Sequence, residues 1–310
     1  MLRQPFDLTS EAVAELVEPP QPLVHLGPRN TRRRTSVATD SSSVHTTLTT
    51  GMRLLDSLGR AVDDTGCTSA QAELMGGTLS RVSYCVPAIC TDGSVPLTYS
   101  ATREAETPAQ LLTASVTFGQ RDGERFMHCH AAWMDARGNV SAGHLWPETL
   151  IGDVPVYAVI HTLPDADLIS STDPETSMPT FVPTARPLAA DTPRSAGSRA
   201  VMSRVGPGED LTQAAVEICR EYGFAQAVVR ASLGSLVGAR LRQGNEMQVV
   251  DGPGTEVVSV AGRLHVRGDT VDGELATILV DRHGQVHAGQ LVRGHNIVAI
   301  TFELFITEEC

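Results

Sequence analysis

The chain carries an internal duplication, and this feature limits its fold more than any other. In the first half, three glycines are separated by 15 and 11 residues: Gly51, Gly66 and Gly77. The second half repeats both intervals at Gly208, Gly223 and Gly234. Similarity at a fixed offset indicates that one structural unit occurs twice. We therefore expect two domains with the same fold.

Each copy is predicted to contain one helix followed by strands. Met52–Thr65 and Asp210–Tyr222 carry apolar residues at helical spacing, and a glycine follows each, as is typical of a helix C-terminus. The β-prone runs of the first copy are Thr68–Met75, Arg81–Val86, Leu111–Phe118, Phe126–Met134 and Val154–Leu163. Those of the second are Ala225–Ser232, Ala239–Gln243, Val257–Ala261, Val271–Val280 and Asn296–Ile306. One helix on a mostly antiparallel sheet predicts an α+β fold for each copy.

The match resumes at the far end of each copy with a different offset. Residues 133–138 (WMDARG) correspond to residues 279–284 (LVDRHG), so the offset is 146 here and 157 at the glycines. The first copy therefore holds about eleven extra residues, which we place within Pro87–Thr107. The 146-residue offset pairs His128 with Glu274, His130 with Ala276 and His144 with Gln290.

Three histidines of the first copy predict a metal site. His128 and His130 are two residues apart, so on a strand both side chains leave the same face. Turn-forming residues 135–139 follow, and a hairpin there brings His144 back beside the pair. Three neutral imidazoles with an open fourth position are typical of a catalytic zinc site. We expect zinc at these histidines and no such metal in the second copy, which is either structural or lends residues to a shared cleft.

Two segments lie outside the copies. Residues 1–45 have the composition of an N-terminal arm, with a short helix, capped by Ser10, expected within Asp7–Val17. Residues 164–200 contain six prolines and have the composition of a linker. Part of this linker, Asp173–Met178, is expected to lie across a site. The first domain is accordingly placed at 46–163 and the second at 201–310.

The composition of the chain disfavours nucleic acid and membranes as partners. The net charge of −12 disfavours nucleic acid, because affinity for phosphates comes mainly from clustered Lys and Arg, and Arg32–Arg34 is too short a run to reverse this. No apolar run approaches the roughly 20 residues of a membrane span. The chain opens without a secretory signal, and its six cysteines form no CxxC pair, so we expect a cytoplasmic protein with reduced thiols.

The helix-glycine-strand pattern of residues 208–236, the His-x-His strand and Gly143-His144 together resemble the PPC domain, named for plants and prokaryotes and also called PCC. The resemblance covers roughly 51–163 and 200–307. It implies a compact α+β fold, self-association as a trimer and, as in prokaryotic members, a metal, expected to be zinc, at His128, His130 and His144. Plant members add an Arg-Gly-Arg-Pro AT-hook, which this sequence lacks, so DNA binding does not carry over.

A zinc ion with an open position predicts an enzyme acting on a small carbonyl or carboxylate compound, by metal-assisted hydrolysis or by lyase or isomerase chemistry. Such chemistry needs an acid or base near the metal, and Glu148 and Glu73 are the candidates. Three arginines flank the metal strand and are candidates for binding a substrate carboxylate: Arg121, Arg125 and Arg137.

The alternative is a non-catalytic binding or regulatory protein, either DNA-associated or small-ligand-binding. In this hypothesis the metal holds a small acid or is structural. The fourth ligand of the metal separates the two hypotheses. Water or a small molecule favours catalysis, whereas a fourth protein ligand favours structure.

Overall fold

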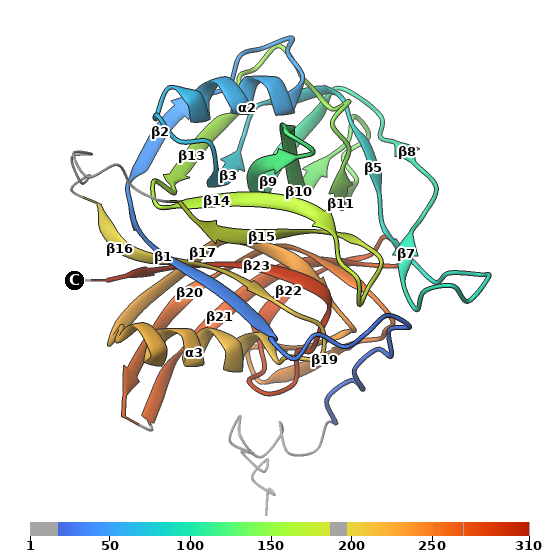
Figure 1. The fold of residues 1–310 in the computed structure, drawn as a ribbon. Coiled ribbons are helices and arrows are strands. Elements are labelled where there is room, and N and C mark those ends of the chain that lie inside the picture. Colours follow the sequence, from blue (N-terminus) through green and yellow to red (C-terminus); the bar gives the residue numbers. More distant parts are fainter. Residues whose placement is uncertain (1–17, 187–196, 269, 310) are drawn as a thin grey trace, which may run out of the picture.

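The computed structural model describes residues 18–186, 197–268 and 270–309. The helix expected at Asp7–Val17 lies outside these residues. Within them the chain forms two large sheets, each with one helix on its outer face, so that four layers are stacked in the order helix, sheet, sheet, helix (Figure 1). This confirms the predicted α+β fold in two copies.

The first sheet belongs to the first copy. Its main strands in spatial order are β2 (Ser43–Thr47), β13 (Tyr157–Thr162), β3 (Ala70–Met75), β9 (Ala109–Arg121), β10 (Glu124–Met134), β11 (Val140–Leu145), β5 (Ser83–Cys85) and β8 (Arg103–Glu104). Short strands β4 (Thr78–Arg81) and β12 (Leu150–Ile151) and the hairpin of β14 (Ala166–Thr172) and β15 (Pro179–Ala185) extend it. A separate pair is formed by β6 (Pro87–Ala88) and β7 (Thr98–Tyr99).

The second sheet has nine strands. Their spatial order is β1 (Arg34–Ser41), β16 (Ser198–Val205), β23 (Val298–Glu308), β17 (Gln226–Leu236), β20 (Thr255–Arg267), β21 (Thr270–Asp281), β22 (Val286–Leu291), β18 (Ala239–Gln243) and β19 (Glu246–Val250). Strand β1 comes from the N-terminal segment and pairs with β16 in antiparallel register, Arg34 lying opposite Val205. The N-terminal segment therefore forms part of the sheet of the second copy.

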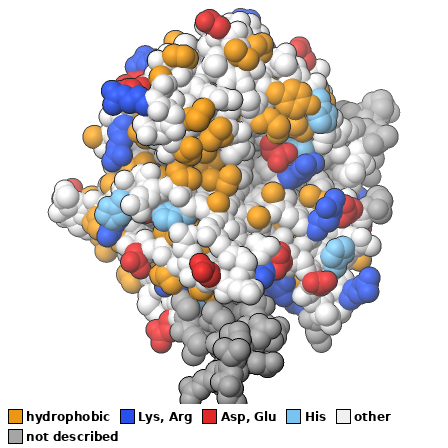
Figure 2. All heavy atoms as spheres, turned by 180° about the vertical axis from the view of Figure 1, so that it is seen from behind, with side chains coloured by type: hydrophobic (Ala, Val, Ile, Leu, Met, Phe, Trp, Pro, Cys, Tyr) orange, Lys and Arg blue, Asp and Glu red, His pale blue; other side chains and the backbone are white. Residues whose placement is uncertain are grey.

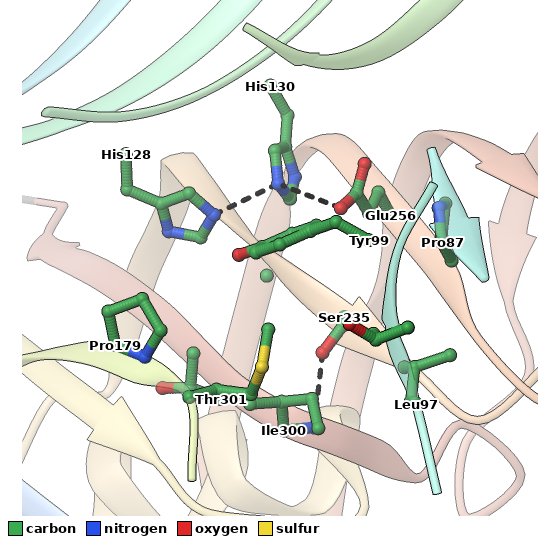
Figure 3. A pocket seen from close by; sticks show the side chains of 13 residues that line it. Pro87, Leu97, Tyr99, His128, His130, Pro179, Ser235, Glu256, Ile300 and Thr301 are labelled. Atoms are coloured by element: carbon green, nitrogen blue, oxygen red, sulfur yellow. Dashed lines mark hydrogen bonds and ion pairs between the residues drawn. The ribbon is translucent and has the colours of Figure 1, made fainter. Parts of the chain in front are cut away.

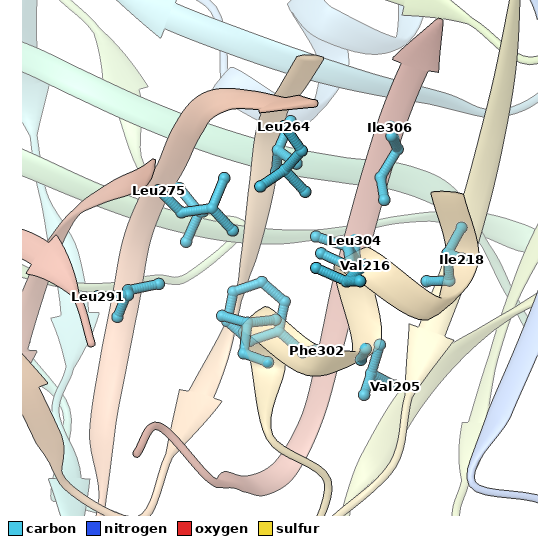
Figure 4. Close-up of a cluster of buried hydrophobic side chains, with 14 of the residues drawn as sticks. Val205, Val216, Ile218, Leu264, Leu275, Leu291, Phe302, Leu304 and Ile306 are labelled. Atoms are coloured by element: carbon cyan, nitrogen blue, oxygen red, sulfur yellow. The ribbon is translucent and has the colours of Figure 1, made fainter. Parts of the chain in front are cut away.

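The two helices lie where the glycine pattern predicts them. Helix α2 (Leu54–Asp63) has one apolar side, made of leucines and Val62, which is buried against the first sheet. Helix α3 (Leu211–Tyr222) starts at Asp210, whose carboxylate accepts a hydrogen bond from the backbone N–H of Gln213, and ends at Gly223 in the left-handed conformation. Figure 4 shows its apolar face packed on the strands of the second sheet, with Phe302 at the centre.

The strand register confirms the duplication residue by residue. His130 lies opposite His144 in the β10–β11 pair, and Ala276 lies opposite Gln290 in the β21–β22 pair. His144 also lies opposite Cys85 on β5, as Gln290 lies opposite Arg242 on β18. Both offsets, 146 and 157, are therefore present in the ladders, and a one-residue slip would turn every side chain to the other face.

The predicted arm and the predicted linker both contain strands, although we expected little regular structure in either. Residues 34–41 of the predicted arm form β1, and the predicted linker contains β14, β15 and the start of β16. The prolines misled the prediction because β15 pairs with β14 alone, and proline is tolerated on such an edge strand. The domain boundaries that we drew from composition stay a prediction.

The inner faces of the two sheets pack directly on each other. Strands β9 and β10 contact β17 and β20, and small apolar side chains such as Ala132 and Ala142 meet Val258 and Val280. At the other end, Phe305 of β23 packs among Leu163, Leu168, Phe181 and Met202 from both copies and the hairpin. No helix within the described residues is long and apolar enough to cross a membrane.

Replacing Phe305 with alanine should destabilise the whole chain by about 3–5 kcal/mol, because its fully buried ring fills the space between the sheets. Urea denaturation of the full chain measures this change. Val249→Ala is the control, since Val249 is 47% exposed on β19 and its replacement should stay within about 0.5 kcal/mol. A cost for Phe305→Ala as small as that of the control would contradict the packing between the sheets.

Candidate metal centre

The three predicted histidines lie together on the inner face of the first sheet. His128 and His130 leave the same face of β10, and His144 is brought opposite His130 by β11. One nitrogen from each ring can be chosen so that all three lie within 4.8 Å of one another. His130 and His144 are buried and His128 is nearly so. Cys129 lies between His128 and His130 in sequence and is buried in the core on the other face of the strand.

The second copy orients two of these rings. Nδ1 of His128 lies 2.7 Å from Oε2 of Glu303, and Nδ1 of His130 lies 2.8 Å from the backbone carbonyl oxygen of Val257. Both oxygens accept hydrogen bonds, so each ring donates through Nδ1 and keeps the lone pair of Nε2 for a metal. The two Nε2 atoms face each other at 2.9 Å.

Several buried polar atoms at this site lack partners among the described residues. They are Nδ1 of His144, Oε1 of Glu303 and Oε2 of Glu256. Oε1 of Glu256 lies 3.9 Å from Nε2 of His130. When ionised, the two buried carboxylates beside these imidazoles carry negative charge that needs compensation, because an uncompensated charge is costly away from water. A divalent cation supplies this compensation, so the residues present fit a metal ion.

Burial also sets the protonation of these groups. Removal from water lowers the pKa of His130 and of His144 well below the ordinary value of 6.5, so both rings are neutral and able to bind a metal at pH 7. Burial raises the pKa of Glu256 to about 8 in the absence of a cation. The neighbouring backbone N–H of His144 opposes this increase.

A small cavity of about 40 Å³ adjoins the histidines (Figure 3). Tyr99 and Leu97 line one side, and both belong to the segment Pro87–Thr107 in which we placed the insertion of the first copy. Met178 and Pro179 line another side, so the Asp173–Met178 segment lies across the site as expected. The floor is formed by the second copy, including Ser235, Ile300 and Thr301. Both additions to the repeated fold therefore close the same cavity.

Ion pairs hold the turn between β14 and β15 in place. Glu175 accepts two hydrogen bonds of 2.7 Å from the guanidinium of Arg33, and Asp173 pairs with Arg204. The arginines lie on the segment before β1 and on β16. The turn is thus fixed to the second sheet, although it follows the first copy in sequence.

The two predicted acid–base residues lie elsewhere. Glu148 is exposed in the turn after β11, and it does not line the cavity. Glu73 pairs with His161 at 3.1 Å and with Arg230 at 3.4 Å, and it lines a different hollow on the surface. The structure brings neither residue to the histidines, and their catalytic role stays a prediction without geometric support.

The three predicted arginines are also scattered. Arg125 pairs with Asp63 of α2 on the outer face of the sheet, and Arg137 pairs with Glu106 and is largely exposed. Arg121 stacks over the ring of Phe126 at 5.5 Å. Their predicted role in binding a substrate has no support from these positions.

The sequence interpretation missed the groups that the second copy supplies. Glu303 lies in the run AITFELFI, and Glu256 lies in TEVVSV, so each is a charged residue inside an otherwise apolar strand. A fully buried acid needs a partner, which makes such a residue a usable signal. The role of Tyr99, whose ring centroid lies 5.1 Å from that of His144, had no comparable signal.

The metal-free chain should lose stability as the pH rises from 6.5 to 8. Folding raises the pKa of Glu256 from 4.5 to about 8, so the folded state binds a proton in this interval that the unfolded state has released. The histidines act in the opposite sense only at lower pH, because their stabilisation is lost as the pH falls below their unfolded value of 6.5. Denaturation in the presence of a chelator measures the slope, and Glu256→Gln should flatten it; equal slopes would contradict this assignment.

Comparisons with known proteins agree with this architecture. The sequence profile of the Plants and Prokaryotes Conserved (PCC) domain matches residues 36–164 and 193–309. Among curated proteins none matches the chain.

Solved structures of similar fold include a metal-containing protein from Archaeoglobus fulgidus, with 16% identity, a TM-score of 0.38 and coverage of 46% of this chain and 93% of that one. A plant- and prokaryote-conserved protein from Pyrococcus horikoshii has 16% identity and a TM-score of 0.36, over 47% of this chain and 94% of its own. A candidate DNA-binding protein from Ralstonia eutropha has 16% identity and a TM-score of 0.37, over 44% and 88%. The PCC profile matches this chain twice, and the two matches cover most of the chain. The chain therefore belongs to the PCC domain family as a tandem member.

Proposed function

We propose that this protein is a non-catalytic binding or regulatory protein in which one zinc ion joins the two PCC domains. The observation that carries the proposal is the division of the site between the copies. The first copy holds the three histidines, and the second holds the carboxylate and the carbonyl that orient them. A metal bound there stabilises the arrangement of the two domains relative to each other, as well as the structure of each domain.

Zinc suits this donor set. Imidazole nitrogens bind zinc at about 2.0–2.1 Å, and three of them leave one position of a tetrahedron for a further ligand. The buried carboxylates of Glu256 and Glu303 balance the charge of a divalent ion. Carboxylate partners of metal-bound histidines are the usual means of fixing ring orientation.

The small size of the cavity favours a metal-binding role over catalysis on a substrate. Ligand sites of enzymes commonly measure about 300–1,000 Å³, whereas the space beside the histidines is about 40 Å³, enough for water. The predicted acid–base residues Glu148 and Glu73 do not line it. The enzyme hypothesis therefore has less support than its non-catalytic alternative.

Among regulatory partners, DNA is disfavoured by charge. The chain carries a net charge of −12, and on the face seen in Figure 2 basic side chains are interspersed with acidic ones. The DNA-binding description of the Ralstonia eutropha protein applies to that protein. We expect no change in the fluorescence anisotropy of a labelled duplex at physiological salt, with or without zinc. Saturable binding that weakens as salt is added would reverse this expectation.

Metal content tests the proposal directly. Elemental mass spectrometry of untagged protein should find one zinc ion per chain in the wild type and none in His130→Ala, because His130 is buried and its Nε2 is directed at His128. His283→Ala is the control, since His283 is an exposed histidine of the second copy and its loss should leave the zinc in place.

Chelation should also lower the melting temperature of the wild type and leave that of His130→Ala unchanged, because a ligand that binds the folded state alone stabilises it. Wild-type protein without metal after incubation with zinc would sink the proposal. Turnover of a small ester or aldehyde that depends on zinc would restore the enzyme hypothesis. Light scattering would separately test the self-association, as a trimer, that the family resemblance implies.

A further inference from the structure

We propose that Glu256 of the second domain is the fourth ligand of the ion held by the three histidines of the first domain. This inference rests on the proposed function and goes beyond it. It makes the ion a direct bond between the two domains and leaves no open position for a reacting water.

The first argument is distance. An ion about 2.0–2.1 Å from an imidazole nitrogen and about 2.0–2.2 Å from a carboxylate oxygen links two atoms that lie at most roughly 4.3 Å apart. Oε1 of Glu256 lies 3.9 Å from Nε2 of His130. One ion can therefore reach both atoms, and a side-chain movement of Glu256 is needed to bring its carboxylate within reach of all three histidines, which already lie together. Figure 3 shows one oxygen of this carboxylate directed at His130.

The second argument is that Glu256 is held in register with the histidines. The next residue, Val257, accepts the hydrogen bond of His130 Nδ1 through its backbone carbonyl. The position of strand β20 is thus tied to the ring that is expected to share the ion. Glu256 is 4% exposed, so its carboxylate has little access to solvent as an alternative partner.

The third argument separates the two carboxylates. Glu303 is engaged with Nδ1 of His128 at 2.7 Å, on the side of the ring away from Nε2, and therefore orients a ligand. Each acid has one oxygen without a partner among the described residues, Oε2 of Glu256 and Oε1 of Glu303. The two differ in which side of a ring they face, because Oε1 of Glu256 lies 3.9 Å from Nε2 of His130, the nitrogen left for the ion.

The fourth argument comes from the duplication. Gln110 lies opposite Met134, as Glu256 lies opposite Val280, so Gln110 is the equivalent of Glu256 in the first copy. By the same register, Tyr157 stands where the second copy has Glu303. The first copy keeps the histidines without the acids, and the second keeps the acids without the histidines. Each copy thus retains the half of the site that meets the other copy within this chain.

Zinc affinity of the full chain, measured by competition with a chromophoric chelator, tests the assignment. Glu256→Ala should weaken zinc binding by more than about 100-fold, since loss of a ligand exceeds the 10–100-fold effect of a group behind a ligand. The loss of zinc affinity in Glu303→Gln should fall within that smaller range. The matched control is Glu246→Gln, because Glu246 is an exposed acid of the same domain. Circular dichroism of each variant checks that it folds.

Cobalt substitution gives a readout of geometry. The visible absorption of cobalt is intense in a four-coordinate site with a carboxylate, and we expect it to change in Glu256→Ala and in Glu256→Gln. Added acetate should restore the wild-type spectrum in Glu256→Ala by occupying the position of the missing side chain. Hydrogen exchange in residues 255–267 should rise when the wild type is chelated and should already be high in Glu256→Ala.

The outcomes separate this inference from the proposed function. An unchanged zinc affinity and cobalt spectrum in Glu256→Ala would overturn Glu256 as a ligand, and the fourth position would then belong to water or to Tyr99, while the histidine site would stand. Absence of metal in the wild type would overturn both. Weak binding in Glu256→Ala with rescue by acetate supports the assignment.

Discussion

Each sheet of this protein has two faces that avoid water, and a single helix covers only one of them. The other face must be buried against something, and here the two inner faces bury each other through small side chains such as Ala132 and Ala142. This packing is the interaction on which the rest of the structure depends. It brings strands β10 and β20 together, and with them the histidines of one copy and the acids of the other. A single copy of the fold has no such layer.

Burial between two sheets makes the polar groups of the site interdependent. His130 and His144 are held in their neutral form by burial, and the carboxylate of Glu256 holds its proton unless a cation replaces it. Neither set of groups is well accommodated alone, because each leaves buried polar atoms without partners. The insertion that carries Tyr99 and the turn that carries Met178 line the small space of about 40 Å³ that remains beside the histidines. Structural zinc sites in proteins are closed, whereas catalytic ones keep an open position, so the burial of this cluster supports the non-catalytic proposal.

Much of this was readable in the sequence, because it depends on short-range periodicity. The glycine spacing predicted both helices, and the two offsets predicted which residues of the copies correspond, as the matching registers of the two hairpins confirm. The histidine cluster followed from alternation along one strand and the return of the next. What local patterns do not contain is the identity of the surface that covers the cluster. Glu256 and Glu303 are far from the histidines in sequence, and Glu148 was chosen in their place because it was near. Strand β1 was missed for a similar reason, since its partner β16 lies more than 150 residues away.

That long separation has a consequence for how the protein is made. Strand β1 leaves the ribosome early, yet the strand that pairs with it begins at Ser198. At about 5–20 residues per second, the intervening chain takes on the order of ten to thirty seconds to synthesise. During this time residues 34–41 have a free edge, and the first sheet has an uncovered inner face. The serine, threonine and aspartate side chains along β1 keep the waiting strand polar, which limits its pairing with other nascent chains. The inner face of the first domain is thus covered only when the second domain has been translated. The histidines therefore meet Glu256 and Glu303 only near the end of synthesis.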